Sequence, residues 1–95
     1  MEHTVVDEQN IINAICIDVA NKYRVMPEDV EAELMYEDDK GFSAEAWANG
    51  RHFPYSEAGL VGAIRQWLAD EFGEDPYALS VRLELNDEGI AAIVS

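Results

Sequence analysis

The chain has little positive charge. Six lysines and arginines oppose 20 aspartates and glutamates, which gives a formal net charge of −14 and an isoelectric point near 4.1. Nucleic-acid binding draws much of its affinity from cationic side chains that displace counterions, and anionic membranes attract the same cations. The excess of acid therefore argues against nucleic acid and membrane as partners, and its self-repulsion favours solubility.

Cysteine and long apolar runs are also scarce. The single cysteine, Cys16, excludes an internal disulfide and suits a reducing cytoplasm. No apolar stretch approaches the roughly 20 residues that span a bilayer. The first residues lack the basic segment and apolar segment of a signal peptide, so we expect a cytoplasmic protein.

Motifs for catalysis, cofactors and metals are missing from the sequence. There is no G-x-G-x-x-G, no phosphate loop and no G-x-S-x-G elbow. Cys16 has no basic neighbour, and His52 has no partners at metal-ligand spacing. The acidic segments 37–39 and 86–88 do not match a calcium loop and are interpreted as solvated turns. We therefore predict no catalytic residue, no cofactor and no metal site.

What the chain does contain is an internal repeat within a single domain, residues 1–95. Residues 7–47 align with 56–95 at an offset of 49, which falls to 48 at a hairpin tip. The equivalent pairs include Asp7 with Ser56, Ile11 with Leu60, Tyr23 with Phe72, Leu34 with Leu83, and Gly41 with Gly89. Agreement among caps, apolar faces and hairpin glycines favours an internal duplication. The alternative is that any two helix-plus-hairpin units look alike.

Each repeat predicts one helix. The first begins after the N-cap Asp7 and ends before Pro27; the second begins after Ser56 and ends at Gly73. The apolar stripes that define the helices are Ile11, Ile12, Ile15, Val19 and Tyr23, then Leu60, Val61, Ile64, Leu68 and Phe72.

A β-hairpin is expected after each helix, because apolar and polar residues alternate along 30–37, 42–47, 79–85 and 90–95. Gly41 and Gly89 close the two hairpin loops and predict a positive φ there. The segment 49–55 is interpreted as an irregular link between the repeats.

The fold class that follows is α+β with the order αββαββ, a circular permutation of a ferredoxin-like arrangement. Numbering these four strands along the chain, we predict one four-stranded antiparallel sheet of order 1-2-4-3, with 2-1-3-4 as the alternative. Both helices cover one face of this sheet, and the opposite face stays open.

That open face is the predicted functional surface. The side chains expected on it as an interface are Trp47, Ile93, Met35, Glu45 and Arg82. An apolar centre within a polar rim is typical of protein interfaces, and tryptophan and arginine are frequent binding anchors.

The run from Met1 to Ala14, with Glu33–Tyr36 and Gly41–Glu45, resembles the YxcD-like proteins of bacilli, a domain of unknown function. The resemblance covers the whole chain. It implies a bacterial cytoplasmic location, and it carries no activity, substrate or catalytic residue.

Three hypotheses of function follow. The favoured one is a non-enzymatic interaction module that binds itself as a homodimer, or another protein, through the open sheet face. The second is an acidic decoy that mimics nucleic acid and occupies a nucleic-acid-binding protein. The third is a small-ligand binder or enzyme whose site has no recognisable motif; fold alone does not support it.

Overall fold

A computed structural model describes residues 4–73, 75 and 78–95. Met1, Glu2 and His3, which open the run that carries the family resemblance, lie outside the described residues. The elements in chain order are β1 (Thr4–Val6), α1 (Glu8–Tyr23), a 3-10 turn η1 (Pro27–Asp29), β2 (Glu31–Glu37), β3 (Gly41–Ala48), β4 (Arg51–Tyr55), α2 (Glu57–Phe72), β5 (Val81–Asn86) and β6 (Gly89–Val94).

The two helices begin where their caps predict. The Asp7 carboxylate accepts a hydrogen bond from the Asn10 amide at 2.9 Å, and the Ser56 hydroxyl accepts one from the Gly59 amide at 3.2 Å. These bonds satisfy amides that have no partner within the first turn of a helix. At its C-terminus α2 ends on Gly73, whose φ of 68° is left-handed, as the sequence predicts.

The prediction of one four-stranded sheet is wrong. The strands form two three-stranded antiparallel sheets, one of order β2-β3-β4 and one of order β1-β6-β5. Both predicted hairpins are present, and Gly41 and Gly89 have the expected positive φ of 79° and 124°. The two hairpins do not pair with each other, because β4 and β1 occupy the positions beside β3 and β6.

A two-residue turn explains why β3 pairs with β4. Asn49 and Gly50 connect the strands with φ values of 52° and 76°, and two positive φ angles are what a type I′ hairpin turn requires. This turn brings the segment 51–55, expected to be an irregular link, against β3 at almost no loop-closure cost. Pro54 lacks an amide donor and is accommodated because β4 is an edge strand.

The sheets exchange strands between the two halves of the chain. The first half runs β1-α1-β2-β3 and the second runs β4-α2-β5-β6. The first strand of each half pairs with the hairpin of the other half: β1 with β6, and β4 with β3. Because β1 and β4 lead directly into α1 and α2, each helix starts at the sheet built on the opposite hairpin. The shared order is consistent with an internal duplication, which stays a prediction.

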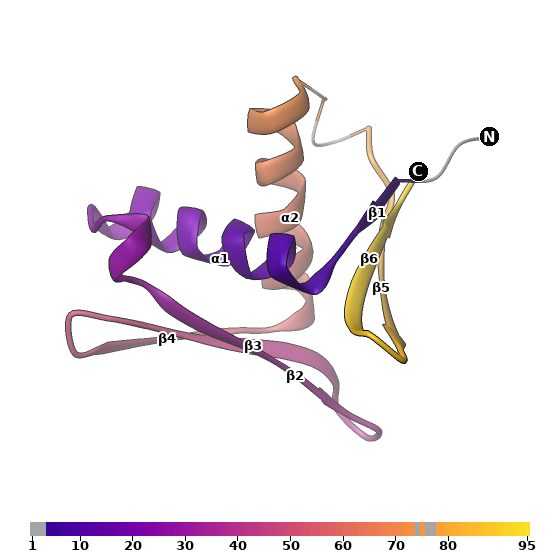
Figure 1. Ribbon diagram of the computed structural model, residues 1–95, viewed down its shortest axis with the longest axis horizontal. Helices are drawn as coiled ribbons and strands as arrows, with labels where there is room; N and C mark the ends of the chain where they lie inside the picture. Colours follow the sequence, from indigo (N-terminus) through magenta and orange to yellow (C-terminus); the bar gives the residue numbers. More distant parts are fainter. Residues whose placement is uncertain (1–3, 74, 76–77) are drawn as a thin grey trace.

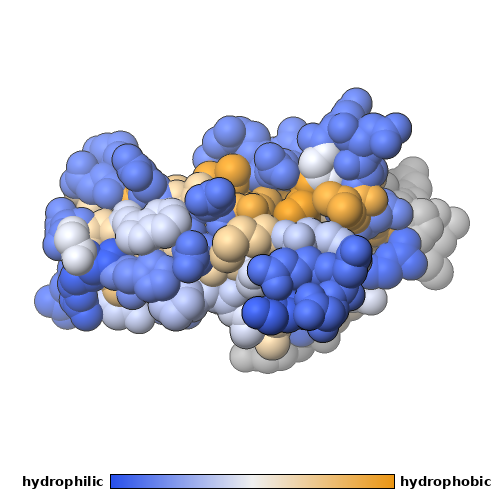
Figure 2. Space-filling model, turned by 90° about the horizontal axis from the view of Figure 1, so that it is seen from below, coloured by the Kyte–Doolittle hydropathy of each residue, from blue (hydrophilic) through white to orange (hydrophobic). Residues whose placement is uncertain are grey.

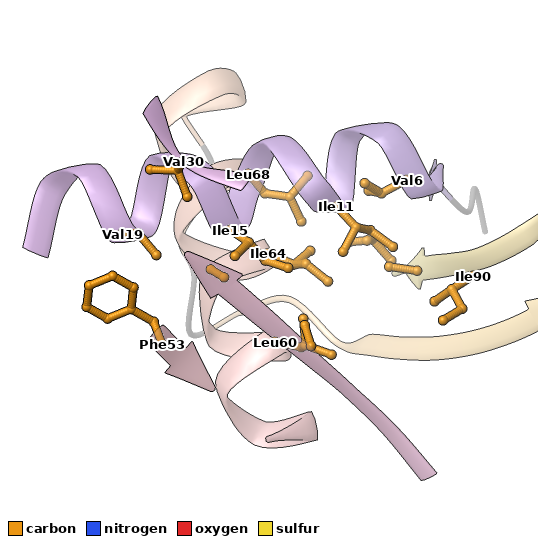
Figure 3. Packing of buried hydrophobic residues seen from close by; sticks show 14 of the residues in the cluster. Val6, Ile11, Ile15, Val19, Val30, Phe53, Leu60, Ile64, Leu68 and Ile90 are labelled. Atoms are coloured by element: carbon orange, nitrogen blue, oxygen red, sulfur yellow. The ribbon is translucent and has the colours of Figure 1, made fainter. Parts of the chain in front are cut away.

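Both helices lie in the angle between the two sheets, so each sheet has one face covered by helix and one face free of it (Figure 1). The helices pack on each other, and each contacts both sheets. Figure 3 shows that α1 and α2 direct large apolar side chains into one shared interior, with Phe53 of β4 at one end and Ile90 of β6 at the other. The largest fully buried side chains are Ile11, Ile15, Val19, Leu60 and Ile64. Burial of such a side chain contributes about 1.5–3 kcal/mol, so this interior is the main source of stability.

Each helix is joined to a hairpin by one glutamate of its first turn. Glu8, at the start of α1, accepts a hydrogen bond from the Ile90 amide at 3.0 Å, just after Gly89. Glu57, at the start of α2, accepts one from the Phe42 amide at 3.3 Å, just after Gly41. A carboxylate in the first helical turn is favoured by the helix dipole, and here it also satisfies a hairpin amide.

Candidate functional site

The structure divides the predicted interface between two surfaces. Trp47 and Glu45 of β3 and Met35 of β2 lie on the helix-free face of the β2-β3-β4 sheet. Ile93 and Arg82 are opposite each other on β6 and β5, in the second sheet. The five residues therefore do not form one surface, because the hairpins that carry them do not pair.

The surface that contains Trp47 is named here the acidic sheet face. The strand register places its members in cross-strand rows: Glu31 beside Trp47 and His52, Glu33 beside Glu45 and Pro54, and Met35 beside Ser43, with Glu37 at the hairpin end. Alternate residues of β3, Ala44, Ala46 and Ala48, are buried against the helices, so the intervening ones point outward. His52 and Pro54 were absent from the predicted interface, and the Asn49-Gly50 dipeptide was the signal that could have found them.

Trp47 is held in place by its neighbours. The indole is 36% exposed and stacks on the His52 ring, with ring centroids 5.6 Å apart and planes inclined by 29°. His52 Nε2 in turn lies 3.2 Å from Glu45 Oε1. A tryptophan oriented this way on a rigid sheet can bury apolar area on a partner with little further loss of conformational freedom.

The acids on this face are arranged at a cost to the fold. Glu33 and Glu45 are direct cross-strand partners, and like charges at such positions are destabilising. Within the described part of the chain, Glu31 and Glu33 have no ion pair, whereas Glu37 has only an exposed contact with Lys40 at 3.6 Å. Four carboxylates thus surround Trp47 and Met35 with almost no compensating cation.

Figure 2 views the molecule from the side of this face. Hydrophilic residues cover most of it, residues of intermediate hydropathy lie among them, and hydrophobic surface gathers toward the side of the second sheet. The acidic sheet face is therefore a charged surface with a small apolar centre, and not a broad apolar patch.

The remaining reactive groups do not form a catalytic arrangement. The Cys16 thiol donates to the Val30 carbonyl oxygen at 3.5 Å, and burial raises the pKa of this thiol, which lowers its nucleophilicity at neutral pH. Across residues 4–73, 75 and 78–95, no group of three or more His, Cys, Asp or Glu side chains is placed to hold a metal ion. In the same residues, neither helix has the length and apolar character needed to cross a bilayer.

Comparison with known proteins identifies the family. Residues 1–88 match the family described as Protein of unknown function (DUF2653). The chain is 32% identical over 92 residues to the uncharacterized protein YxcD of Bacillus subtilis (strain 168). The aligned region covers 95% of this chain and 90% of that protein. No solved structure matches the chain. The resemblance to the YxcD-like proteins is thus confirmed, and the chain belongs to the DUF2653 family.

Proposed function

We propose that this protein is a non-enzymatic interaction module that binds a basic segment of another protein through the acidic sheet face. The observation that carries the proposal is the cross-strand pair Glu33–Glu45 beside the exposed Trp47. Natural proteins accept local arrangements that weaken the fold mainly where function requires them. A partner that supplies arginine or lysine would relieve the repulsion and cover the indole.

Charge complementarity favours a different protein over a second copy of the chain. A symmetric dimer through this face would bring the same four glutamates against themselves, and juxtaposed like charges oppose association. We therefore expect the homodimer predicted from the sequence not to form through the acidic sheet face. Sedimentation at about 100 μM, far above the Kd of a stable dimer, should show a monomer; a dimer abolished by Trp47→Ser would contradict the hetero-partner proposal.

Spacing along β2 favours one class of basic partner. Glu31, Glu33 and Glu37 share one side of the strand, where alternate residues are about 6.8 Å apart. This is twice the ~3.4 Å axial spacing of phosphates along one DNA strand. The decoy hypothesis, in which the face occupies a nucleic-acid-binding protein, is the form of the proposal that this spacing supports.

A pair of matched variants tests the proposal. Glu33→Lys and Glu84→Lys change the net charge equally, but Glu84 lies on β5, where it is paired with Ala91. Immobilised wild-type protein and both variants would be incubated with lysate of the source bacterium, and any retained protein would be purified and titrated by calorimetry. We expect a basic partner that binds wild type and the Glu84→Lys variant and loses about tenfold or more in affinity for the Glu33→Lys variant.

The same titration tests the decoy form. If the partner binds duplex DNA, competition by DNA for the module supports that form, whereas simultaneous binding of both rejects it. A purified partner that binds the two lysine variants equally would refute the acidic sheet face as the binding surface.

We also infer a bacterial cytoplasmic setting for this interaction. The single partly buried thiol and the relative from Bacillus subtilis support it.

A further inference from the structure

A hollow beside the edge strand β4 brings basic and aromatic side chains together. Its volume is about 420 Å³, and it lies where the end of α1, the strand β4 and the start of α2 meet. The residues that line it are Lys22, Tyr23, Arg51, His52, Phe53, Pro54, Tyr55, Ser56 and Gly59. No carboxylate is among them, although the chain carries 20 acidic residues. The hollow is thus a local region of basic and aromatic character on an acidic protein.

Arg51 is the central cation of this hollow. Its guanidinium carbon lies 5.4 Å from the ring centroid of Tyr23 and 5.5 Å from that of Phe53. The two rings are themselves in contact, with centroids 4.3 Å apart. Among the described residues no carboxylate lies within ion-pair distance of Arg51. The rings orient the guanidinium, and its N–H donors stay available for an acceptor from outside the chain.

Two acids contact residues of the lining, and both are already engaged: Glu45 Oε1 lies 3.2 Å from His52 Nε2, and Asp18 contacts two residues. Asp18 Oδ2 accepts the Tyr55 hydroxyl at 2.6 Å and lies 3.0 Å from Lys22 Nζ. The Asp18 side chain is only 13% exposed, so it sits behind the lining and its charge is balanced by Lys22. The charge of Arg51 therefore remains uncompensated at the mouth of the hollow.

We propose that the Arg51 hollow binds a small organic ligand that joins an oxyanion, a carboxylate or a phosphate, to a flat apolar body. The planar guanidinium matches either oxyanion through two parallel hydrogen bonds. The flat body packs on the aromatic and proline side chains of the lining, and the N-terminus of α2, which begins beside Ser56 and Gly59, adds a favourable dipole. This site shares His52 and Pro54 with the acidic sheet face, but it is centred on Arg51, whose guanidinium rests on the Tyr23 and Phe53 rings.

An NMR titration of the isotope-labelled full chain tests the site with two probes that share the flat body, benzoate and phenyl phosphate. Sodium chloride at equal ionic strength controls for screening of the acidic surface. We expect saturable shifts at the amides of residues 22–23, 51–53, 55–56 and 59, with a Kd of about 1–10 mM for fragments of this size. The probe that saturates at the lower concentration identifies the oxyanion.

Two arginine variants complete the test. Arg51→Gln should weaken binding about tenfold or more, whereas Arg82→Gln, an equal charge change on β5, should leave it unchanged. Arg51→Lys keeps the charge but loses the planar guanidinium, so its affinity for the probe should lie between those of wild type and Arg51→Gln. If Arg51→Gln does not fold, the affinity of Arg51→Lys decides the test. Shifts that stay linear for both probes, that follow sodium chloride, or that are equal in the Arg51 and Arg82 variants would overturn the proposal.

Discussion

Replacing Glu33 with lysine should make the fold more stable while it removes the proposed binding function. In the native sheet Glu33 on β2 is directly opposite Glu45 on β3, and both side chains point away from the helices. Lysine at position 33 converts this like-charge pair into an opposite-charge pair on the same two strands. Stability and binding are expected to change in opposite directions because the carboxylates serve the partner and not the fold.

The magnitude follows from the pairing. A cross-strand pair of this kind is worth roughly 0.2–1 kcal/mol, and the substitution removes one unfavourable pair and adds one favourable pair. The expected gain is therefore about 1 kcal/mol in the free energy of unfolding, which raises Tm by about 4–8 °C in a domain of this size. Part of any gain reflects the lower net charge of the whole molecule, which the control must remove.

Glu84→Lys is that control, since it changes the net charge by the same amount but Glu84 is opposite Ala91. Both variants would be unfolded thermally and in urea at low salt and again at about 1 M salt, where the Debye length falls to ~3 Å. The advantage of Glu33→Lys over Glu84→Lys should be present at low salt and shrink at high salt. Equal stability of the two variants at low salt would refute the cross-strand repulsion.

Two further predictions concern the backbone and the pH dependence of stability. Gly89→Ala should cost about 2 kcal/mol or more in urea unfolding, because a φ of 124° strains any L side chain and the added Cβ, 2.6 Å from Glu8 Oε1, would displace the carboxylate that accepts from the Ile90 amide. Gly50→Ala meets open space at a φ of 76° and should cost about 1 kcal/mol. Burial, followed by the hydrogen bond to Asp18, raises the pKa of Tyr55 above its ordinary 10.0. The unfolded chain then loses this proton first, so the free energy of unfolding should fall as pH rises above 10, and it should fall less in Tyr55→Phe. Urea melts at about pH 9 and 11 measure this fall, and an equal fall in wild type and Tyr55→Phe would contradict the assignment.

Local features of the fold were predictable because nearby residues determine them. The caps Asp7 and Ser56, the helical stripes and the hairpin glycines each depend on a few neighbours in sequence. The outward direction of Trp47 followed from strand alternation in the same way.

The arrangement of the sheets could not be predicted because the sequence pattern favours an irregular link at 51–55 and gives no strand signal at 4–6. β1 has three residues, and β4 contains a proline and two aromatic residues without clear alternation. Asn49-Gly50 was nevertheless a strong hairpin signal, and with it the order β2-β3-β4 was within reach of the sequence. The pairing of β1 with β6 joins the two ends of the chain and has no comparable local signal.

The candidate sites show the same division. Trp47, Met35 and Glu45 share one side of a hairpin, as strand alternation predicts, whereas the position of Ile93 and Arg82 relative to them depends on which strands pair. The Arg51 hollow brings together α1, β4 and α2, and its Tyr55–Asp18 contact joins residues 37 positions apart.

By itself, the amino-acid sequence determined the acidic charge, two capped amphipathic helices, two glycine-closed hairpins and the family. The tertiary structure alone decided that the strands divide into two sheets, that Glu33 is opposite Glu45 beside a stacked Trp47, and that Arg51 rests on two aromatic rings. The reason is physical. Caps, turns and apolar periodicity act over a few residues, whereas the choice among strand partners is settled by how both helices and both hairpins bury one shared interior.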